Sequence, residues 1–310
     1  MIIDRLMEKI DELKNPTVIG LDTRLDYLPD YILEKWGLIS GKATMDNAAE
    51  AVLEFNKTIV DNIYDIVPAV KIQIACYEML GLPGLSVFNR TVDYCRDKGL
   101  IVIGDAKRND IGSTAREYAR AFLGETQFGD LVLGRAFPVD FLTVNPYLGY
   151  DGVQPFIECC KKYNKGIFVL AKTSNASSCQ IQDLKTQDER VFQAVARLIH
   201  EWGRELVGKN GYSCVGAVVG ATYPEQARIL RASMPHTFFL VPGYGAQGGK
   251  AEDIALCFDN QGRGAIVNAS RSILCSYRAD RWKDKFTSEE FGQAARAEAL
   301  RMRDDITRYL

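Results

Sequence analysis

The sequence predicts an α/β protein: a single (β/α)8 TIM barrel spanning residues 1–310, with extra helices and loop insertions. Short β-rich runs recur along the chain, and each is followed by a stretch with helical spacing. That alternation is typical of a closed parallel barrel. In addition, 310 residues with 47% hydrophobic content can close one large core, and barrels of this kind often reach that size as one domain.

The predicted strands number eight. In chain order they are "TVIGLD" at 17, "AVKIQ" at 69, "LIVIGDAK" at 100, "FLTVNP" at 141, "GIFVLAKTS" at 166, "CVGAVVGAT" at 214, "TFFLVPG" at 237 and "GAIVNAS" at 264. An open, doubly wound sheet is the alternative. However, "GLDTRLDYLPD" follows the first strand where a dinucleotide-binding sheet would carry G-x-G-x-x-G, so the sequence disfavours dinucleotide binding.

Between the strands, apolar residues recur every three or four positions, which predicts helices packed on the outside of the sheet. The predicted core stripes are Val52, Phe55, Ile59, Ile63 and Ile66, and then Val191, Val195, Leu198 and Trp202. The amino terminus has a similar stripe (Ile3, Leu6, Ile10 and Leu13) among charged residues, unlike the continuous apolar core of a signal peptide. The last 31 residues, from 280, predict closing helices.

Two stretches exceed the minimal barrel unit, at about residues 23–44 and 175–188. The second is polar and rich in Ser, Asn and Gln. Both follow predicted strand ends, where barrel proteins build their sites. They are therefore expected either to cover a site or to decorate its rim.

Composition narrows the possible partners and the compartment. Lys and Arg total 38 against 40 acidic residues, so no global field favours nucleic acid or an anionic membrane. The apolar stretches are too short to cross a bilayer. Eight cysteines without a C-x-x-C pair predict reduced thiols and a cytoplasmic protein, and two histidines without ligand spacing predict no zinc site.

The stretch "IVIGDAKRNDIGST" carries an apolar strand into Asp105, Lys107 and Asp110. Residues two apart in a strand face the same way, so Asp105 and Lys107 are expected on one side, at the barrel end where active sites lie. Lys71 lies in the preceding apolar strand and is expected to meet Asp105. A structural salt-bridge cluster is the alternative, but burying charges is costly and seldom improves on apolar packing.

The last two predicted strands are followed by features suited to an anion. "VPGYGAQGG" offers Pro242, Gln247 and Gly248 in a loop whose backbone can approach a ligand closely, and "NASRSI" offers Arg271. Barrels frequently bind a phosphate at these two loops. An ordinary Gly-rich turn with a surface arginine is the alternative.

Taken together, these pieces resemble the orotidine 5'-phosphate decarboxylase family, in its longer, type 2 branch. The matching stretches are "GLD" ending at Asp22, Lys71 in its strand, "DAKRNDIGST" from 105, "KTSN" around Ser174, "PGYGAQGG" from 242, and Arg271. The resemblance implies conversion of orotidine 5'-phosphate to UMP and carbon dioxide in pyrimidine biosynthesis. It also implies that no cofactor or metal takes part.

For the reaction, loss of carbon dioxide leaves a poorly delocalised carbanion at C6, which requires electrostatic help from the site. Lys107 is then expected to stabilise this carbanion and protonate it, while Asp105 opposes the substrate carboxylate. Lys71 and Asp110 are expected to hold the array in its charged form and to bind ribose hydroxyls.

For binding, the resemblance implies that Asp22 contacts the ribose and Ser174 the pyrimidine amide. Gln247 and Arg271 would bind the phosphate. It further implies a homodimer, in which Asp110 and Thr114 reach the neighbouring subunit's site.

Two other functions stay open from the residues. A magnesium-dependent barrel decarboxylase acting on a phosphorylated keto-sugar acid shares the D-x-K-x-x-D pattern, although Lys71 would repel the metal. A non-catalytic barrel that binds a phosphorylated ligand is the second, although such a protein does not need the full charge array.

Overall fold

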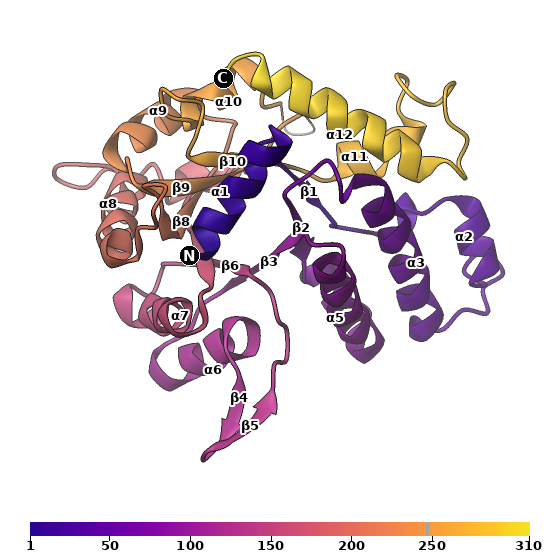
Figure 1. Ribbon diagram of the computed structural model, residues 1–310, viewed down its shortest axis with the longest axis horizontal. Coiled ribbons are helices and arrows are strands. Elements are labelled where there is room, and N and C mark those ends of the chain that lie inside the picture. Colours follow the sequence, from indigo (N-terminus) through magenta and orange to yellow (C-terminus); the bar gives the residue numbers. More distant parts are fainter. Residues whose placement is uncertain (246–247) are drawn as a thin grey trace.

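The computed structural model describes residues 1–245 and 248–310, and within them eight parallel strands close into a barrel (Figure 1). The barrel strands are β1 (Thr17–Gly20), β2 (Ala69–Gln73), β3 (Ile101–Arg108), β6 (Phe141–Val144), β7 (Gly166–Lys172), β8 (Ser213–Val219), β9 (Thr237–Pro242) and β10 (Ala265–Ala269). Each pairs with the next one along the chain, and β10 pairs with β1 to close the ring. The predicted fold class and every predicted strand are confirmed.

Helices surround the barrel, as Figure 1 shows. The outer helices are α3 (Met45–Ile63), α5 (Gly81–Asp97), α6 (Gly112–Leu123), α7 (Tyr150–Tyr163), α8 (Val191–Gly203), α9 (Pro224–Ser233), α10 (Ala251–Ile254) and α12 (Phe291–Thr307). Short helices lie in the loops: α2 (Asp30–Lys35), α4 (Ala75–Glu78), α11 (Arg271–Leu274), η1 (Leu25–Tyr27), η2 (Ala176–Gln180), η3 (Arg204–Leu206), η4 (Ala255–Cys257) and η5 (Ser276–Arg278). The last helix completes the ring against α3, where Phe291 stacks on Phe55 at 4.6 Å between ring centroids.

All five apolar residues of the first predicted stripe are buried, and four of them lie in α3, whereas Ile66 lies three residues past its end. The predicted stripe of α8 is wrong by about one residue. The face turned to the barrel carries Phe192, Ala196, Ile199 and Gly203, whereas the predicted stripe residues are half-buried. The reason is close packing: a side chain at Gly203 would lie 2.7 Å from the Ser213 hydroxyl of β8, so only a glycine face allows this approach.

The amino-terminal helix α1 (Ile2–Leu13) lies across the barrel end at which the strands begin, and Figure 1 shows it in front of the barrel. Its Ile2 N–H donates to the Asn164 side chain, just before β7, and Asp4 accepts from the Asn210 N–H, just before β8. Ile3 and Leu6 are buried beneath it. The predicted helix is confirmed, and it caps the end opposite to the charged strand ends.

Aromatic rings fill the barrel near this covered end. Phe141 of β6 stacks on Phe168 of β7 with ring centroids 5.2 Å apart. Gly216 of β8 leaves room for them, because a Cβ there would lie 2.7 Å from the Phe168 ring. Open space is thereby restricted to the carboxyl ends of the strands.

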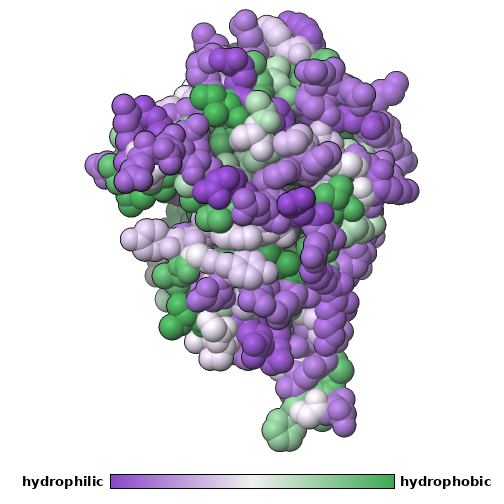
Figure 2. Space-filling model, turned by 90° about the vertical axis from the view of Figure 1, so that its left-hand side faces the viewer, coloured by the Kyte–Doolittle hydropathy of each residue, from purple (hydrophilic) through white to green (hydrophobic). Residues whose placement is uncertain are grey.

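A hairpin that the sequence did not predict extends from the barrel between α6 and β6. It consists of β4 (Thr126–Phe128) and β5 (Leu131–Gly134), paired antiparallel and exposed along their length. Figure 2 shows it as a narrow extension at the bottom of the molecule that carries apolar residues. Among the described helices, none is both long enough and apolar enough to span a membrane.

Candidate active site

A cavity of about 690 Å³ opens at the carboxyl ends of the barrel strands. Seven residues predicted for the site line it: Asp22, Lys71, Asp105, Lys107, Ser174, Pro242 and Arg271. They come from six different strand ends and the segments that follow them. The topology therefore brings together residues that are up to 249 positions apart in the chain, from 22 to 271.

Four of these side chains form a continuous chain of alternating charge. The Lys71 ammonium donates to Asp22 at 2.7 Å and to Asp105 at 2.9 Å. The Lys107 ammonium donates to the other oxygen of Asp105 at 2.5 Å. The expected Lys71–Asp105 contact is therefore present. Within one chain, Asp22 rather than Asp110 supplies the second carboxylate to Lys71.

Asp105 and Lys71, at the centre of the array, are held in their ionised forms. Burial alone would raise the pKa of Asp105, but the Lys71 and Lys107 ammonium groups outweigh it and hold the pKa well below its usual range. Burial alone would lower the pKa of Lys71, but Asp105 and Asp22 outweigh it and raise the pKa above its usual range. Asp105 is thus an anion and Lys71 a cation throughout the physiological pH range.

A backbone irregularity in β3 places Lys107. Both the Ala106 and the Lys107 N–H groups donate to the Thr143 hydroxyl of β6 at 2.9 Å, and this hydroxyl donates to Asp105 at 2.9 Å. The register of β3 against β6 shifts at this point, and Lys107 has φ 48°, in the left-handed region. Strained conformations of this kind cluster at functional sites. Simple strand alternation does not predict this geometry.

Asp110 and Thr114 lie outside this cavity. Asp110 is in the loop after β3, and its carboxylate accepts from the Ile111 N–H at 2.8 Å. Thr114 is exposed in the first turn of α6. Ile111, between them, is 62% exposed although apolar. The loop thus presents polar and apolar groups away from its own chain's charge array.

Pro242, Tyr244 and Arg271 line the same cavity, at the ends of β9 and β10. The Tyr244 hydroxyl donates to Asp305 of α12 at 2.6 Å, and Arg301 donates to the same hydroxyl at 3.3 Å. These bonds tie the start of the Gly-rich loop to the last helix. Gly248 lies beside a separate, shallower cavity, and Gln247 is outside the described residues.

Ser174 reaches the cavity from the segment after β7. Its carbonyl accepts from the Thr222 hydroxyl at 3.1 Å. Gly220 permits the close approach of the two loops, since a Cβ there would lie 2.8 Å from the Ser174 backbone nitrogen. The predicted insertion at 175–188 begins at this rim, and Asn175 also lines the cavity.

Several cavity residues were not predicted from the sequence. Gln73 donates to Asp105 at 3.0 Å, and it was detectable because it lies two positions after Lys71 on the same face of β2. Thr143 lies in a predicted strand but gave no charge signal. Asn268 of β10 also lines the cavity, and its buried Oδ1 has no hydrogen-bond partner among the described residues.

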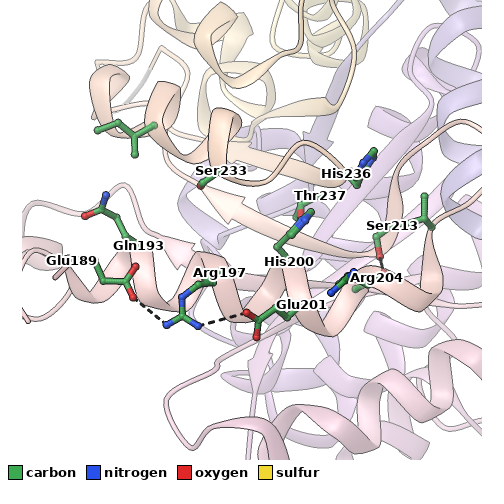
Figure 3. Close-up of a pocket in the computed structure, with 13 residues that line it drawn as sticks. Glu189, Gln193, Arg197, His200, Glu201, Arg204, Ser213, Ser233, His236 and Thr237 are labelled. Carbon is green, nitrogen blue, oxygen red and sulfur yellow. Dashed lines mark hydrogen bonds and ion pairs between the residues drawn. The ribbon is translucent and has the colours of Figure 1, made fainter.

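A second cavity, of about 640 Å³, lies outside the barrel between α8, α9 and the starts of β8 and β9 (Figure 3). The fold stacks the two histidines here, His200 and His236, with ring centroids 6.2 Å apart. The guanidinium of Arg197 is paired with Glu189 and Glu201. Across residues 1–245 and 248–310, no three side chains of His, Cys, Asp or Glu are grouped to hold a metal ion.

Chemically, the first cavity combines a fixed carboxylate, two ammonium groups and the guanidinium of Arg271. One ammonium, Lys107, is 45% exposed toward the open space, whereas the Lys71 side chain is 4% exposed. The exposed ammonium can therefore meet a ligand while the buried one orients Asp105. Such pre-oriented charges can stabilise negative charge that develops during a reaction.

Comparisons with known proteins agree with this arrangement. The family model described as "Orotidine 5'-phosphate decarboxylase / HUMPS family" matches residues 40–280. An orotidine 5'-phosphate decarboxylase of Caldicellulosiruptor bescii is 44% identical over 89% of this chain and 90% of that protein. One from Clostridium acetobutylicum is 40% identical over the full length of both. The solved structure of Leishmania donovani OMP decarboxylase is 27% identical, with a TM-score of 0.73 over 99% of this chain and 98% of that one.

Proposed function

The chain belongs to the orotidine 5'-phosphate decarboxylase family and is a carboxy-lyase that acts on orotidine 5'-phosphate, and from this premise we propose how its residues carry the reaction. The observation that carries the proposal is the chain of ion pairs Asp22–Lys71–Asp105–Lys107 at the mouth of the barrel. The direct test follows the ultraviolet absorbance of orotidine 5'-phosphate as it is converted to UMP. Release of one carbon dioxide for each UMP formed is expected.

The substrate carboxylate is placed beside Asp105, whose negative charge disfavours a second anion there. When the bond between C6 and the carboxylate breaks, the electron pair stays on C6 and carbon dioxide leaves. The Lys107 ammonium stabilises this carbanion and then gives it a proton, and water restores the proton to Lys107. Lys71 keeps Asp105 charged and oriented through its 2.9 Å contact.

For the rest of the nucleotide, Ser174 contacts the pyrimidine amide and Asp22 the ribose. Arg271 binds the phosphate with Pro242 and the Gly-rich loop, including Gln247 and Gly248. The position of Arg271 supports this, since it lines the same cavity as the charge array. The enzyme then supplies UMP in pyrimidine biosynthesis.

The active form is a homodimer in which Asp110 and Thr114 complete the neighbouring subunit's site. Two features support this. Asp110 is absent from the described lining of its own chain's cavity, and the exposed Ile111 beside it suits burial against a second copy. We place the enzyme in the cytoplasm, because all eight cysteines, each within the described ranges, are free thiols.

Activity is expected to survive removal of divalent cations. Lys71 and Lys107 surround Asp105 with positive charge, which disfavours Mg²⁺ at this carboxylate. Turnover is measured after dialysis against EDTA, with and without added Mg²⁺, and a known magnesium-dependent enzyme treated in parallel is the control. Loss of activity that Mg²⁺ restores would support the keto-sugar acid alternative instead.

Replacing Arg271 with alanine is expected to lower kcat/KM for orotidine 5'-phosphate by about 10²-fold, because a charge-assisted contact to the phosphate is lost. Turnover of orotidine, which has no phosphate, should change little. Arg281→Ala, at an exposed position outside the cavity lining, is the matched control. Equal losses on both substrates would contradict a phosphate role for Arg271.

A further inference from the structure

We propose that the partly buried ion pair between Lys172 and Asp183, together with Gln182, is a positioning device that sets Ser174 at the base end of the cavity and so determines affinity for the pyrimidine. Neither Lys172 nor Asp183 lines the cavity. Their effect on the substrate would pass through the segment that they anchor. The inference rests on the proposed contact of Ser174 with the base.

Lys172 is the last residue of β7, and an irregular register turns it away from the cavity. Leu170, two residues earlier, lines the cavity, and strict alternation would point Lys172 the same way. The pairing of β7 with β8 shifts between these two residues. The Lys172 ammonium instead lies over the Tyr223 ring at 4.5 Å and near the Phe192 ring of α8 at 5.9 Å.

In this position Lys172 contacts the insertion at residues 175–188 through Asp183. Its ammonium donates to Asp183 at 3.0 Å, and Gln226 of α9 donates to the same oxygen at 3.1 Å. Arg190 donates to the Asp183 carbonyl at 2.7 Å. The Lys172 side chain is 1% exposed and that of Asp183 is 17% exposed. The far end of the insertion is therefore tied to the barrel by a charge pair whose lysine is fully buried.

Gln182, next to Asp183 in the chain, connects this ion pair to the rim of the cavity. The side-chain oxygen of Gln182 accepts from the Thr173 N–H at 3.0 Å, and its side-chain NH2 donates to the Thr173 hydroxyl at 2.7 Å. Thr173 in turn donates to the Asn175 side chain at 2.6 Å. Ser174 lies between these two residues. The position of the Ser174 backbone is thus fixed by Gln182, the residue next to Asp183.

The energetics favour a positioning role over a purely stabilising one. A buried ion pair often adds no net stability over apolar residues of similar size, because desolvation offsets the attraction. Another buried pair, Lys165 with Asp140 at 3.0 Å, lies at the opposite end of the barrel, and neither residue lines the active-site cavity. It provides a matched control for the loss of a buried charge pair.

The experiment compares binding of UMP with binding of ribose 5-phosphate, which lacks the base, by isothermal titration calorimetry. The double variant Lys172→Met/Asp183→Leu removes both charges and leaves none unpaired. Its Kd for UMP is expected to rise about tenfold, and its Kd for ribose 5-phosphate to stay within about twofold. The control variant Lys165→Met/Asp140→Leu should leave both constants within about twofold.

Ser174→Ala separates this inference from the proposed function on which it rests. Suppose that Ser174→Ala weakens binding of UMP but not of ribose 5-phosphate, and that the Lys172/Asp183 variant weakens neither. The positioning role is then wrong. If Ser174→Ala leaves both ligands unchanged, the assignment of Ser174 to the base is wrong, and the inference falls with it. Equal weakening of both ligands by the Lys172/Asp183 variant would indicate general loosening and would also overturn the inference.

A milder variant covers the case in which the double variant does not fold. Gln182→Ala removes both bonds to Thr173 without disturbing a charge, and it is expected to weaken UMP binding about fivefold with ribose 5-phosphate unaffected. Gln154→Ala, on the exposed side of α7, is its control. An unchanged ratio of the two constants for Gln182→Ala would overturn the positioning role.

Discussion

Replacing Lys107 with alanine is expected to lower kcat for orotidine 5'-phosphate by about 10³-fold, because the variant loses both the proton donor and the cation beside the carbanion. Asp105 keeps its ion pair with Lys71 at 2.9 Å, so the remaining array should stay folded and charged. Turnover is followed by ultraviolet absorbance under conditions in which enzyme is saturated with substrate.

Binding of UMP separates loss of chemistry from loss of structure in this variant. UMP carries no carboxylate at C6, so Lys107→Ala should still bind it. Lys209→Ala, which removes an exposed lysine paired with Glu8, should match the wild type in both measurements. Wild-type turnover by Lys107→Ala would rule out its role as proton donor. Equal absence of turnover in wild type and variant, with UMP bound by both, would indicate a binding protein.

Mixing two inactive variants is expected to restore activity if Asp110 acts across a dimer interface. Lys107→Ala inactivates the site of its own subunit, whereas Asp110→Ala would inactivate the neighbouring one. In a heterodimer of the two, one site then has a native Lys107 and receives a native Asp110. After random reassortment, half of the dimers are mixed and half of their sites are intact, so about a quarter of wild-type activity should return.

The controls for this mixing experiment are each variant alone and a mixture made without subunit exchange. Both should stay at the low activity of the single variants. If Asp110 served its own subunit, every site in the heterodimer would lack either Lys107 or Asp110, and mixing would restore nothing. Size-exclusion chromatography at the assay concentration establishes that the mixed species is a dimer.

The barrel could be predicted from sequence because each strand is a short β-rich run between helical repeats, and the structure has a strand at each of those runs. The hairpin at residues 126–134 could not, since its strands are exposed and carry no alternation of buried and exposed side chains. The α8 stripe was misplaced because hydrophobicity favoured Trp202, whereas packing favoured the small Gly203 against β8. Local pattern thus identified the elements, and close packing decided which face of α8 is buried.

The candidate site was predictable where charge interrupts an apolar strand, as at Lys71 and Asp105. The sequence could not indicate that Thr143 would bond two consecutive backbone N–H groups of β3, because this depends on a register shift between two strands. Nor does a single sequence indicate which subunit Asp110 serves. The contributions of neutral side chains, and the geometry between neighbouring strands, are the features of the site that only the structure shows.

The backbone at Lys107 also bears on how this enzyme can change over evolution. With φ 48°, the residue adopts a conformation that glycine takes without penalty and that a branched or long side chain resists. A chain selected only to resist unfolding would favour glycine at this position, and it would lose its proton donor in the same step. Stability and catalysis therefore favour different residues at this one position. The Thr143 hydroxyl, which accepts from the Ala106 and Lys107 N–H groups, stabilises the left-handed backbone that the lysine would otherwise disfavour.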